Sequence, residues 1–305
     1  MNPNAYCRQQ AAQSGSSFYY SFLFLPVAQR EAIMALYAFC RTVDDVVDTV
    51  SDITIASKKL HWWRAEIERM FAADPANPAT HPICLALHAP AIHYGLKPQE
   101  FYAVIAGMEM DLQQQFYNDD ETLSIYCWRV ASVVGMMSAR IFSGDIKLDC
   151  NSYATYMGQA LQRINIIRDV GEDALLGRVY LPADLLDKHG LKPADVLSRQ
   201  ASPAMTAVLQ LMAIQAWQYL TYALNALESL PKSQIKAQRS SLIMARVYAA
   251  LLLEIERSQF LVLKQRISLT PIKKLWLAWL TWVAPHSAFK TLRTLTLAKT
   301  QADNA

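Results

Sequence analysis

Glycine is scarce in this chain, with nine residues in 305, less than half of the usual share of roughly 7%. Strand signals are missing as well, because no β-branched alternation bounded by Asn-Gly or Asp-Gly turns occurs, and such segments mark β-hairpins. The residues that are abundant, among them alanine, leucine, glutamine and arginine, lose little free energy on entering a helix. The composition therefore predicts an all-α protein.

Cysteine is too sparse and too scattered to form a set of disulfides or a zinc site. The five cysteines are an odd number and contain no Cys-x-x-Cys pair, which argues against a disulfide scaffold and a zinc module. No basic region followed by an apolar stretch opens the sequence, so no secretory signal is expected. The apolar run 275–283 is far shorter than the ~20 residues that cross a bilayer. We therefore expect a cytoplasmic protein.

An excess of charge of one sign is also lacking, because 29 basic residues face 26 acidic ones and give a net charge of +3. Neither a dense basic cluster nor a helix-turn-helix or RNP pattern occurs, which argues against nucleic acid as a partner. Glycine-rich turns between a strand and a helix are missing, so no Rossmann nicotinamide site is expected. The 53% of apolar residues and 18% of charged ones suffice for a large core and exclude disorder.

Apolar residues recur at three- and four-residue spacing through most of the sequence, which is the pattern of amphipathic helices. Breaks fall where turn residues gather, for example at Asp74-Pro75-Ala76-Asn77-Pro78. None is long enough to link two domains, and no repeat of about 20 to 50 residues indicates a solenoid. Helices are expected at 27–50, 54–72, 82–94, 98–116, 121–142, 150–173, 203–229, 239–266 and 271–283.

A first set of chemically useful side chains lies on the helix expected at 27–50. At positions i, i+4, i+7 and i+11 stand Tyr37, Arg41, Asp44 and Asp48. This spacing places all four on one helical face. The flanking positions are apolar, so the polar stripe is expected to face the interior or a cavity.

The helix expected at 150–173 repeats this arrangement. At positions i, i+3, i+7 and i+11 stand Gln162, Asn165, Asp169 and Asp173. One Asp-x-x-x-Asp match is a weak motif, and surface charge on an amphipathic helix is the alternative interpretation. Two such matches, each on an apolar helix and each beside an arginine, favour a shared site.

Paired carboxylates on an apolar helix face need a cation. Carboxylates at i and i+4 repel each other, and withdrawal from water adds a cost unless positive charge compensates. Mg²⁺ prefers oxygen ligands and is typically held by one or two carboxylates together with substrate phosphates. The sequence therefore predicts a site where a few Mg²⁺ ions grip a diphosphate. Arginine suits the remaining phosphate oxygens, and the candidates are Arg41, Arg168, Arg178, Arg246 and Arg266.

Three ordered motifs carry a resemblance to a known family. They are Tyr37-Ala-x-Cys-Arg41-x-x-Asp44-Asp45-x-x-Asp48, then Tyr126-Cys127-x-x-Val130-Ala131-x-Val133-Val134-Gly135, then Gly158-x-x-x-Gln162-x-x-Asn165-x-x-Arg168-Asp169-Val170-x-Glu172-Asp173 with Arg178-x-Tyr180-Leu181-Pro182. By these motifs nearly the whole chain resembles the squalene/phytoene synthases, which are head-to-head prenyl synthases of the α-helical isoprenoid synthase group. In the second motif Trp128 and Ser132 stand where relatives frequently have Tyr and Gly.

The resemblance implies a single-domain isoprenoid synthase helical bundle around a central cavity at 1–285, followed by a basic C-terminal tail at 286–305. It implies a Mg²⁺-dependent prenyltransferase. By position, the metal ligands would be Asp44, Asp45, Asp48, Asp169 and Asp173. The substrate-binding residues would be Ser17, Arg41, Gln162, Asn165, Arg168, Arg178 and Arg266. The catalytic residues would be Tyr37, Arg41, Tyr126, Arg168 and Tyr248.

The segment 15–26 is most similar to bacterial members of this family that act in the hopanoid pathway. The resemblance then implies condensation of two farnesyl diphosphates to presqualene diphosphate, with release of diphosphate, in squalene and hopanoid biosynthesis. The alternatives are a one-step NADPH-dependent squalene synthase, a phytoene synthase that uses geranylgeranyl diphosphate, and a non-catalytic helical assembly factor of the same fold. The complete set of carboxylates argues against the last of these.

The C-terminal region has its own charge pattern. Residues 264–305 hold seven basic residues and one acidic residue. Lys273 and Lys274 precede a short apolar helix in which Trp276, Trp279 and Trp282 stand three apart. Such a helix can lie on an anionic membrane or pack on the bundle. Peripheral membrane contact through this region is therefore one expectation, and packing on the body of the protein is the other.

Overall fold

The computed structural model describes residues 2–13, 21–50, 52–72, 74–113, 116–144 and 149–302 of the chain. Within these ranges the regular structure is helical, and the only β-pairing is one isolated parallel bridge between Phe116 and Val179. The predicted all-α fold, built as a single helical domain, is confirmed. Ser17, a predicted substrate-binding residue, lies outside the described residues.

The helices follow one another through short connections. In chain order they are α1 (Pro3–Gln13), α3 (Val27–Thr49), α4 (Ile53–Ala72), α5 (Pro82–His93), α6 (Pro98–Gln113), α7 (Asp120–Cys127), the π-helical turn η1 (Trp128–Ser132), α8 (Val133–Ser143), α9 (Asn151–Leu175), α10 (Ala183–Lys188), α11 (Pro193–Leu197), α12 (Pro203–Glu228), α13 (Lys232–Ala237), α14 (Arg239–Arg257), the 3₁₀ turn η2 (Leu261–Leu263), α15 (Pro271–Val283) and α16 (Pro285–Ala302).

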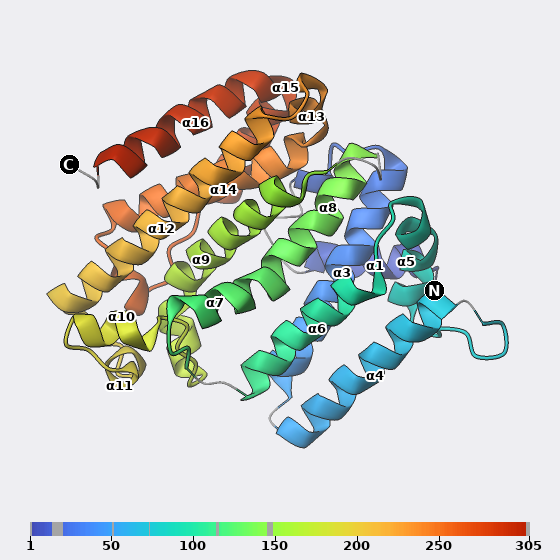
Figure 1. The fold of residues 1–305 in the computed structure, drawn as a ribbon, viewed down its shortest axis with the longest axis horizontal. Coiled ribbons are helices and arrows are strands. Elements are labelled where there is room, and N and C mark those ends of the chain that lie inside the picture. The colour runs from blue at the N-terminus through green and yellow to red at the C-terminus, as the bar shows by residue number, and fades with distance from the viewer. Residues whose placement is uncertain are drawn as a thin grey trace.

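Two large hydrophobic clusters form most of the core. The first gathers side chains of α1, α3, α4, α5, α6 and α8, and Phe39 stands in it with ring centroids 5.7 Å from Trp63 and 5.2 Å from Phe101. The second gathers α7, α9, α12 and α14 around the buried Trp217. Figure 1 shows α9, α12 and α14 on one side of the α7–α8 segment and α3, α4 and α6 on the other. Val130, in η1, packs against both clusters, so the segment joins the two halves.

Helix starts follow local capping chemistry. The side chain of Ser202 accepts a hydrogen bond at 3.1 Å from the backbone N–H of Met205, and Pro203 occupies the first turn of α12. Thr270 caps α15 in the same way, with Pro271 in the first turn. A hydroxyl before the helix satisfies one free N–H, and proline costs nothing there because its missing N–H has no helical partner. Both starts agree with the predicted ones.

Two predicted helices are divided in the structure. The helix expected at 239–266 ends at Arg257, because Gln259 and Phe260 adopt φ values of +53° and +57°, which a right-handed helix does not contain. The helix expected at 121–142 is interrupted by the turn η1. The sequence analysis did not predict α1 and α16, the second of which stands where a basic tail was expected. It also missed α10, α11 and α13, which have only five or six residues, too few to show a helical period.

Glycine lets α9 lie directly against η1. A Cβ atom at Gly158 would stand 2.4 Å from the Cα atom of Ser132 and 2.5 Å from its nitrogen. Ser132 is fully buried at this crossing, and its hydroxyl donates to the carbonyl of Thr155 at 2.8 Å. The close approach brings α9 within reach of the helices of the first cluster, and it thereby sets the width of the space between α3 and α9.

The C-terminal residues form α16, which packs on α12 and α14. Its buried apolar side chains are Ala288, Phe289 and Leu292, and Thr296 is buried as well. Arg293 forms an ion pair with Glu228 at 2.7 Å, and Lys299 pairs with Glu256. The basic segment is therefore held on the body of the protein by an apolar face and by ion pairs up to Ala302.

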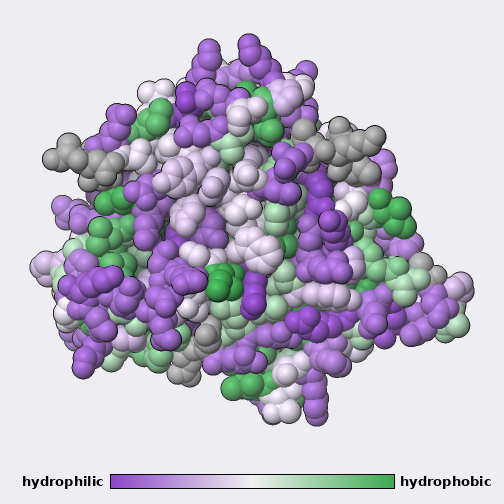
Figure 2. Space-filling view, in the orientation of Figure 1, coloured by the Kyte–Doolittle hydropathy of each residue, from purple (hydrophilic) through white to green (hydrophobic). Residues whose placement is uncertain are grey.

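Hydrophilic residues cover most of the face of the molecule seen in Figure 2, where hydrophobic residues form small separate groups. In the described ranges, no helix combines the length and the apolar character that crossing a bilayer requires.

Candidate active site

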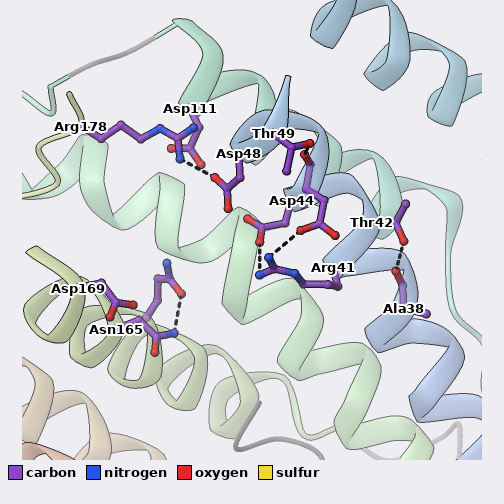
Figure 3. A network of polar contacts seen from close by, with 12 residues as sticks. Ala38, Arg41, Thr42, Asp44, Asp48, Thr49, Asp111, Asn165, Asp169 and Arg178 are labelled. Carbon is purple, nitrogen blue, oxygen red and sulfur yellow. Dashed lines mark hydrogen bonds and ion pairs between the residues drawn. The ribbon is translucent and has the colours of Figure 1, made fainter. Parts of the chain in front are cut away.

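Two helices turn polar stripes toward each other across a gap. α3 buries Ala35, Leu36 and Phe39 completely in the first hydrophobic cluster, and its polar stripe is left facing the gap. Figure 3 shows Asp44 and Asp48 of α3 and, on the opposing helix α9, Asp169, all directed into this space. The helical period of the sequence thus places both stripes, and the packing of the two helices makes them face each other.

Arg41 lies between two carboxylates of its own helix. Its Nη1 stands 3.0 Å from Oδ2 of Asp44, and its Nη2 stands 2.7 Å from Oδ1 of Asp45. Withdrawal from water, reinforced by the charge of Asp48, raises the pKa of Asp44 to about 7 although Arg41 opposes the shift. The protein therefore compensates the charge of this carboxylate only in part.

Arg178, which follows α9, connects the two stripes. Its Nη1 donates to Oδ1 of Asp48 at 2.7 Å, and its Nη2 donates to the carbonyl of Val47 at 3.1 Å. Withdrawal from water and the charge of Asp169 raise the pKa of Asp173 to about 8, with Asp48 adding to the shift from across the gap and Arg178 opposing it. Carboxylates of α3 and α9 are thus close enough to affect one another's protonation.

Positive side chains gather on the α9 side of the gap. Nε of Arg168 donates to Oδ1 of Asp169 at 2.7 Å, and Nε of Arg266 lies 3.2 Å from the same oxygen. Nη1 of Arg266 also lies 3.3 Å from Glu172. Burial, together with the charges of Arg168 and Arg266, lowers the pKa of Lys274 on α15. Three cations from three different parts of the chain therefore converge here, which suits an anion with several oxygens.

The acidic residues fit a metal that arrives together with a ligand. Among the described residues, no three side chains of the types His, Cys, Asp and Glu are arranged to hold an ion by themselves. Asp44 and Asp173 carry pKa values raised by withdrawal from water and by neighbouring carboxylates, so both lack sufficient positive charge. Oxygen donors on two facing helices suit Mg²⁺, which usually keeps several waters and takes further oxygens from a substrate phosphate.

The polar gap borders an apolar cavity. The gap and the cavity share the lining residues Tyr37, Cys40, Val130, Gln162 and Asn165, so the two adjoin each other at these side chains. Beyond these residues the walls are almost entirely apolar, and they include Phe22, Ile33, Leu36, Val134, Phe142 and Met157. We call the charged part the mouth and the apolar part the cavity. Such a space accepts a molecule with an anionic head and a long apolar tail.

Asp111 on α6 is a residue of the site that the sequence analysis missed. Its carboxylate accepts hydrogen bonds from the hydroxyl groups of Tyr126 and Tyr180, both at 2.9 Å, and from that of Tyr117 at 3.4 Å. Burial raises the pKa of Asp111 to about 6, against the lowering effect of these hydroxyl groups and of Arg178. Asp111 has no acidic partner at helical spacing, so the only signal was a lone carboxylate between apolar neighbours.

The structure brings most predicted site residues to the mouth. Those that line it are Tyr37, Arg41, Asp44, Tyr126, Gln162, Asn165, Arg168, Tyr248 and Arg266. Asp48, Asp173 and Arg178 stand beside them through the interactions described above. Asp45 is bound to Arg41, with its side chain 41% exposed. Arg246 lies apart from the mouth, because it donates at 3.1 Å to Thr281 between α14 and α15. Lys274 is a mouth residue that the sequence analysis did not assign to the site.

The fold and the site define a helical protein in which two acidic helices flank a charged mouth above an apolar cavity. A sequence model of squalene/phytoene synthases matches residues 11–273. The chain is 39% identical over 248 residues to the presqualene diphosphate synthase of Zymomonas mobilis, with 80% of this chain and 82% of that protein covered. It is 32% identical over 281 residues to the phytoene synthase of Arthrospira platensis, with coverages of 88% and 89%.

Solved structures agree. The squalene synthase HpnC from Alicyclobacillus acidocaldarius superimposes with a TM-score of 0.74 at 25% identity, covering 85% of this chain and 94% of that one. A dehydrosqualene synthase shares the fold with a TM-score of 0.80 at 23% identity, with coverages of 95% and 97%. The chain therefore belongs to the squalene/phytoene synthase family. Its relatives are synthases that join prenyl units, and this protein is an enzyme of that type.

Proposed function

We propose that this enzyme condenses two farnesyl diphosphates head to head to presqualene diphosphate and releases one diphosphate. The observation that carries the proposal is a cation-rich, carboxylate-flanked mouth that adjoins an apolar cavity. Identity supports the choice within the family, because three presqualene diphosphate synthases match at 35–39% and the phytoene synthases at 30–32%.

Substrate binding follows from the division of the space. The guanidinium groups of Arg168 and Arg266 and the ammonium group of Lys274 bind diphosphate oxygens at the mouth, because all three converge there. The farnesyl chain enters the apolar cavity, where burial of its methyl and methylene groups is favourable by ~25 cal/mol per Å². Tyr37, Gln162 and Asn165 stand at the boundary and hold the reacting carbon atoms between head and tail.

Ionisation of the first substrate requires stabilisation of the leaving diphosphate. Arg168, Arg266 and Lys274 supply positive charge where negative charge develops, which is electrostatic catalysis by groups already in place. Mg²⁺, which we propose is held by Asp44, Asp48, Asp169 and Asp173 together with the diphosphate, would add Lewis-acid stabilisation of the same group. Arg41 and Arg178 keep the carboxylates of α3 oriented toward the mouth.

Formation of the product then depends on the cavity walls. The allylic cation left by ionisation is attacked by the C2–C3 double bond of the second farnesyl diphosphate. Loss of one proton closes a cyclopropane ring, and the product keeps the second diphosphate. The apolar walls exclude water, which would otherwise capture the cation. Phe22, Leu36 and Phe142 supply such walls.

The test is incubation of the purified protein with farnesyl diphosphate and Mg²⁺, with and without NADPH, followed by mass spectrometry of phosphorylated and neutral products. We expect presqualene diphosphate under both conditions. Squalene that forms only with NADPH would replace the proposal by a one-step squalene synthase. Turnover of geranylgeranyl diphosphate without turnover of farnesyl diphosphate would replace it by a phytoene synthase. No turnover of either would contradict a catalytic role.

A further inference from the structure

α15 is held on the protein by one of its faces. Ala278 and Thr281 are fully buried, and the hydroxyl of Thr281 accepts a hydrogen bond from Arg246 at 3.1 Å. The ring of Trp282 stacks on Phe24 with centroids 5.2 Å apart, and the guanidinium of Arg239 stands 3.3 Å above the same ring. The expectation that this helix packs on the bundle is therefore met by this face, and Trp282 belongs to it.

The other face of α15 is apolar and uncovered. Ile272, Leu275, Trp276, Trp279 and Val283 have exposed fractions of 82%, 46%, 56%, 46% and 63%. They stand at positions i, i+3, i+4, i+7 and i+11 and form one line along the helix, which we call the α15 stripe. The rings of Trp276 and Trp279 stack at 5.3 Å. A contiguous apolar stripe of this kind marks a surface that binds something.

The charge around the stripe selects among partners. Residues 264–302 contain seven basic residues and no acidic one. Four of them are paired with carboxylates of the protein, namely Arg266, Lys273, Arg293 and Lys299, and Lys274 lines the mouth. Lys264, before the stripe in the chain, and Lys290, after it, are exposed. Exposed apolar and tryptophan side chains on a helix, with exposed lysines in the chain segments on both sides of it, are typical of a helix that lies in the interface of an anionic membrane. A twofold pairing of two copies would instead place these like charges near each other.

The same helix forms part of the rim of the active site. Lys274 of α15 lines the mouth, and so does Leu269 just before the helix. The mouth and the α15 stripe therefore lie next to each other, because α15 contributes side chains to both.

We propose that α15 docks the protein on an anionic bilayer through the stripe, with the mouth of the active site held at the membrane surface. The docking stands on the stripe and its charges alone. Docking also has a consequence for the product, which has two isoprenoid chains: it would pass from the cavity into lipid without crossing bulk water. This consequence rests on the proposed function.

Vesicle flotation tests the docking. The full chain is mixed with vesicles of phosphatidylcholine and phosphatidylglycerol, and separately with vesicles of phosphatidylcholine alone. We expect flotation with the first, weakened by salt because the headgroup attraction is screened. The double variant Trp276→Gln with Trp279→Gln should lower the vesicle affinity at least about tenfold, since burial of the indole rings in lipid removes apolar surface from water.

A matched control replaces two exposed isoleucines on other helices, Ile53→Gln on α4 and Ile92→Gln on α5, which are 63% and 68% exposed. This variant should float like the wild type. Equal flotation of the tryptophan variant and the wild type, or no flotation at all, would overturn the docking. A wild type that is dimeric in gel filtration and a tryptophan variant that is monomeric would assign the stripe to a second copy.

Product analysis in the same samples separates the docking from the proposed function. Flotation without turnover of farnesyl diphosphate would leave the docking intact and remove the function. With turnover, newly formed presqualene diphosphate should appear in the vesicles sooner for the wild type than for the tryptophan variant, whose product first enters the aqueous phase. The initial rate with detergent-dispersed substrate should be the same for both, because neither tryptophan lines the mouth.

Discussion

At the scale of single residues, the site rests on carboxylates that the fold holds in positions unfavourable for negative charge. Asp44 and Asp173 are partly withdrawn from water and stand near other carboxylates, which raises both pKa values. The arginines offset part of this cost through ion pairs such as that between Arg178 and Asp48 at 2.7 Å. A protein tolerates such an arrangement where a ligand supplies the missing positive charge.

Replacement of the carboxylates should remove activity without unfolding the protein. Asp44→Asn and Asp169→Asn are each expected to lower kcat by about 10²-fold to 10³-fold, the usual effect of removing one group that stabilises charge in a transition state. The measurement is steady-state release of diphosphate, with circular dichroism to confirm the helical content. Asp187→Asn on α10 is the matched control, because Asp187 is exposed and lies outside the mouth. Unchanged turnover in both site variants would refute the assigned role.

The raised pKa values also predict how the stability of the metal-free protein depends on pH. The folded protein keeps protons on Asp44 up to about pH 7 and on Asp173 up to about pH 8, whereas the ordinary value for aspartate is 3.8. Between the ordinary pKa of aspartate and these raised values, the folded state binds more protons than the unfolded chain. The free energy of unfolding therefore falls as the pH rises through this range. The two groups leave stability unaffected below pH ~4, where both states are protonated.

Thermal unfolding in the presence of a chelator at about pH 5 and about pH 8 measures this effect. We expect a lower Tm at the higher pH for the wild type and a smaller difference for the double variant Asp44→Asn with Asp173→Asn. Asp187→Asn should behave as the wild type does. A Tm that is higher at the higher pH in the wild type, but not in the double variant, would show that the two aspartates affect stability in the opposite direction.

At the scale of elements, the contact between α9 and η1 positions the site. Gly158 allows the backbone of α9 to approach that of Ser132, and α9 carries Asp169 and Asp173 on the same rigid rod. The turn η1 also carries Val130, which lines both the mouth and the cavity. A displacement at this crossing therefore moves one acidic stripe relative to the other.

Gly158→Ala should lower the free energy of unfolding by ~1–3 kcal/mol, the usual cost of forcing atoms into a packed interior. The added Cβ would stand 2.4 Å from Ser132, and backbone cannot move aside as a flexible side chain can. Gly135→Ala is the comparison variant and should lose less stability, because its Cβ would stand 3.0 Å from the carbonyl oxygen of Ala154, a tight contact that a shift of a few tenths of an ångström relieves. Urea unfolding of both variants is the measurement. Equal stability of Gly158→Ala and the wild type would contradict the close contact.

At the scale of the whole molecule, the site lies where two hydrophobic clusters meet. α3 belongs to the first cluster and α9 to the second, so the two acidic stripes stand on separate parts of the core. A ligand that bridges the stripes connects these parts and opposes their separation. The site and the stability of the whole fold are coupled for this reason.

Inorganic diphosphate and Mg²⁺ together should therefore raise the Tm of the protein more than the sum of their separate effects. A ligand present at about 100 times its Kd stabilises the folded state by ~2.7 kcal/mol. The measurement is differential scanning fluorimetry with each component alone and with both. The double variant Asp44→Asn with Asp169→Asn should show no extra rise in Tm when diphosphate and Mg²⁺ are added together. Additive shifts, or the same joint effect in this variant, would contradict a site shared by the two helices.

Much of this protein could be predicted from its sequence, because the information is local. The period of apolar residues determines where most helices run, and Ser202 and Thr270 mark two of their starts. The spacing of Asp44 and Asp48, and of Asp169 and Asp173, places each pair on one helical face whatever the helices pack against. The all-α fold and the two acidic stripes therefore followed from the sequence.

Only the tertiary structure decided which of these local features meet. Asp111 has no pattern of its own, and it joins the site because α6 brings it to the hydroxyl groups of Tyr126 and Tyr180. Lys274 reaches the mouth while Trp276 on the same helix faces outward. Such outcomes depend on contacts between residues far apart in the chain, and packing, which the local pattern does not contain, sets those distances.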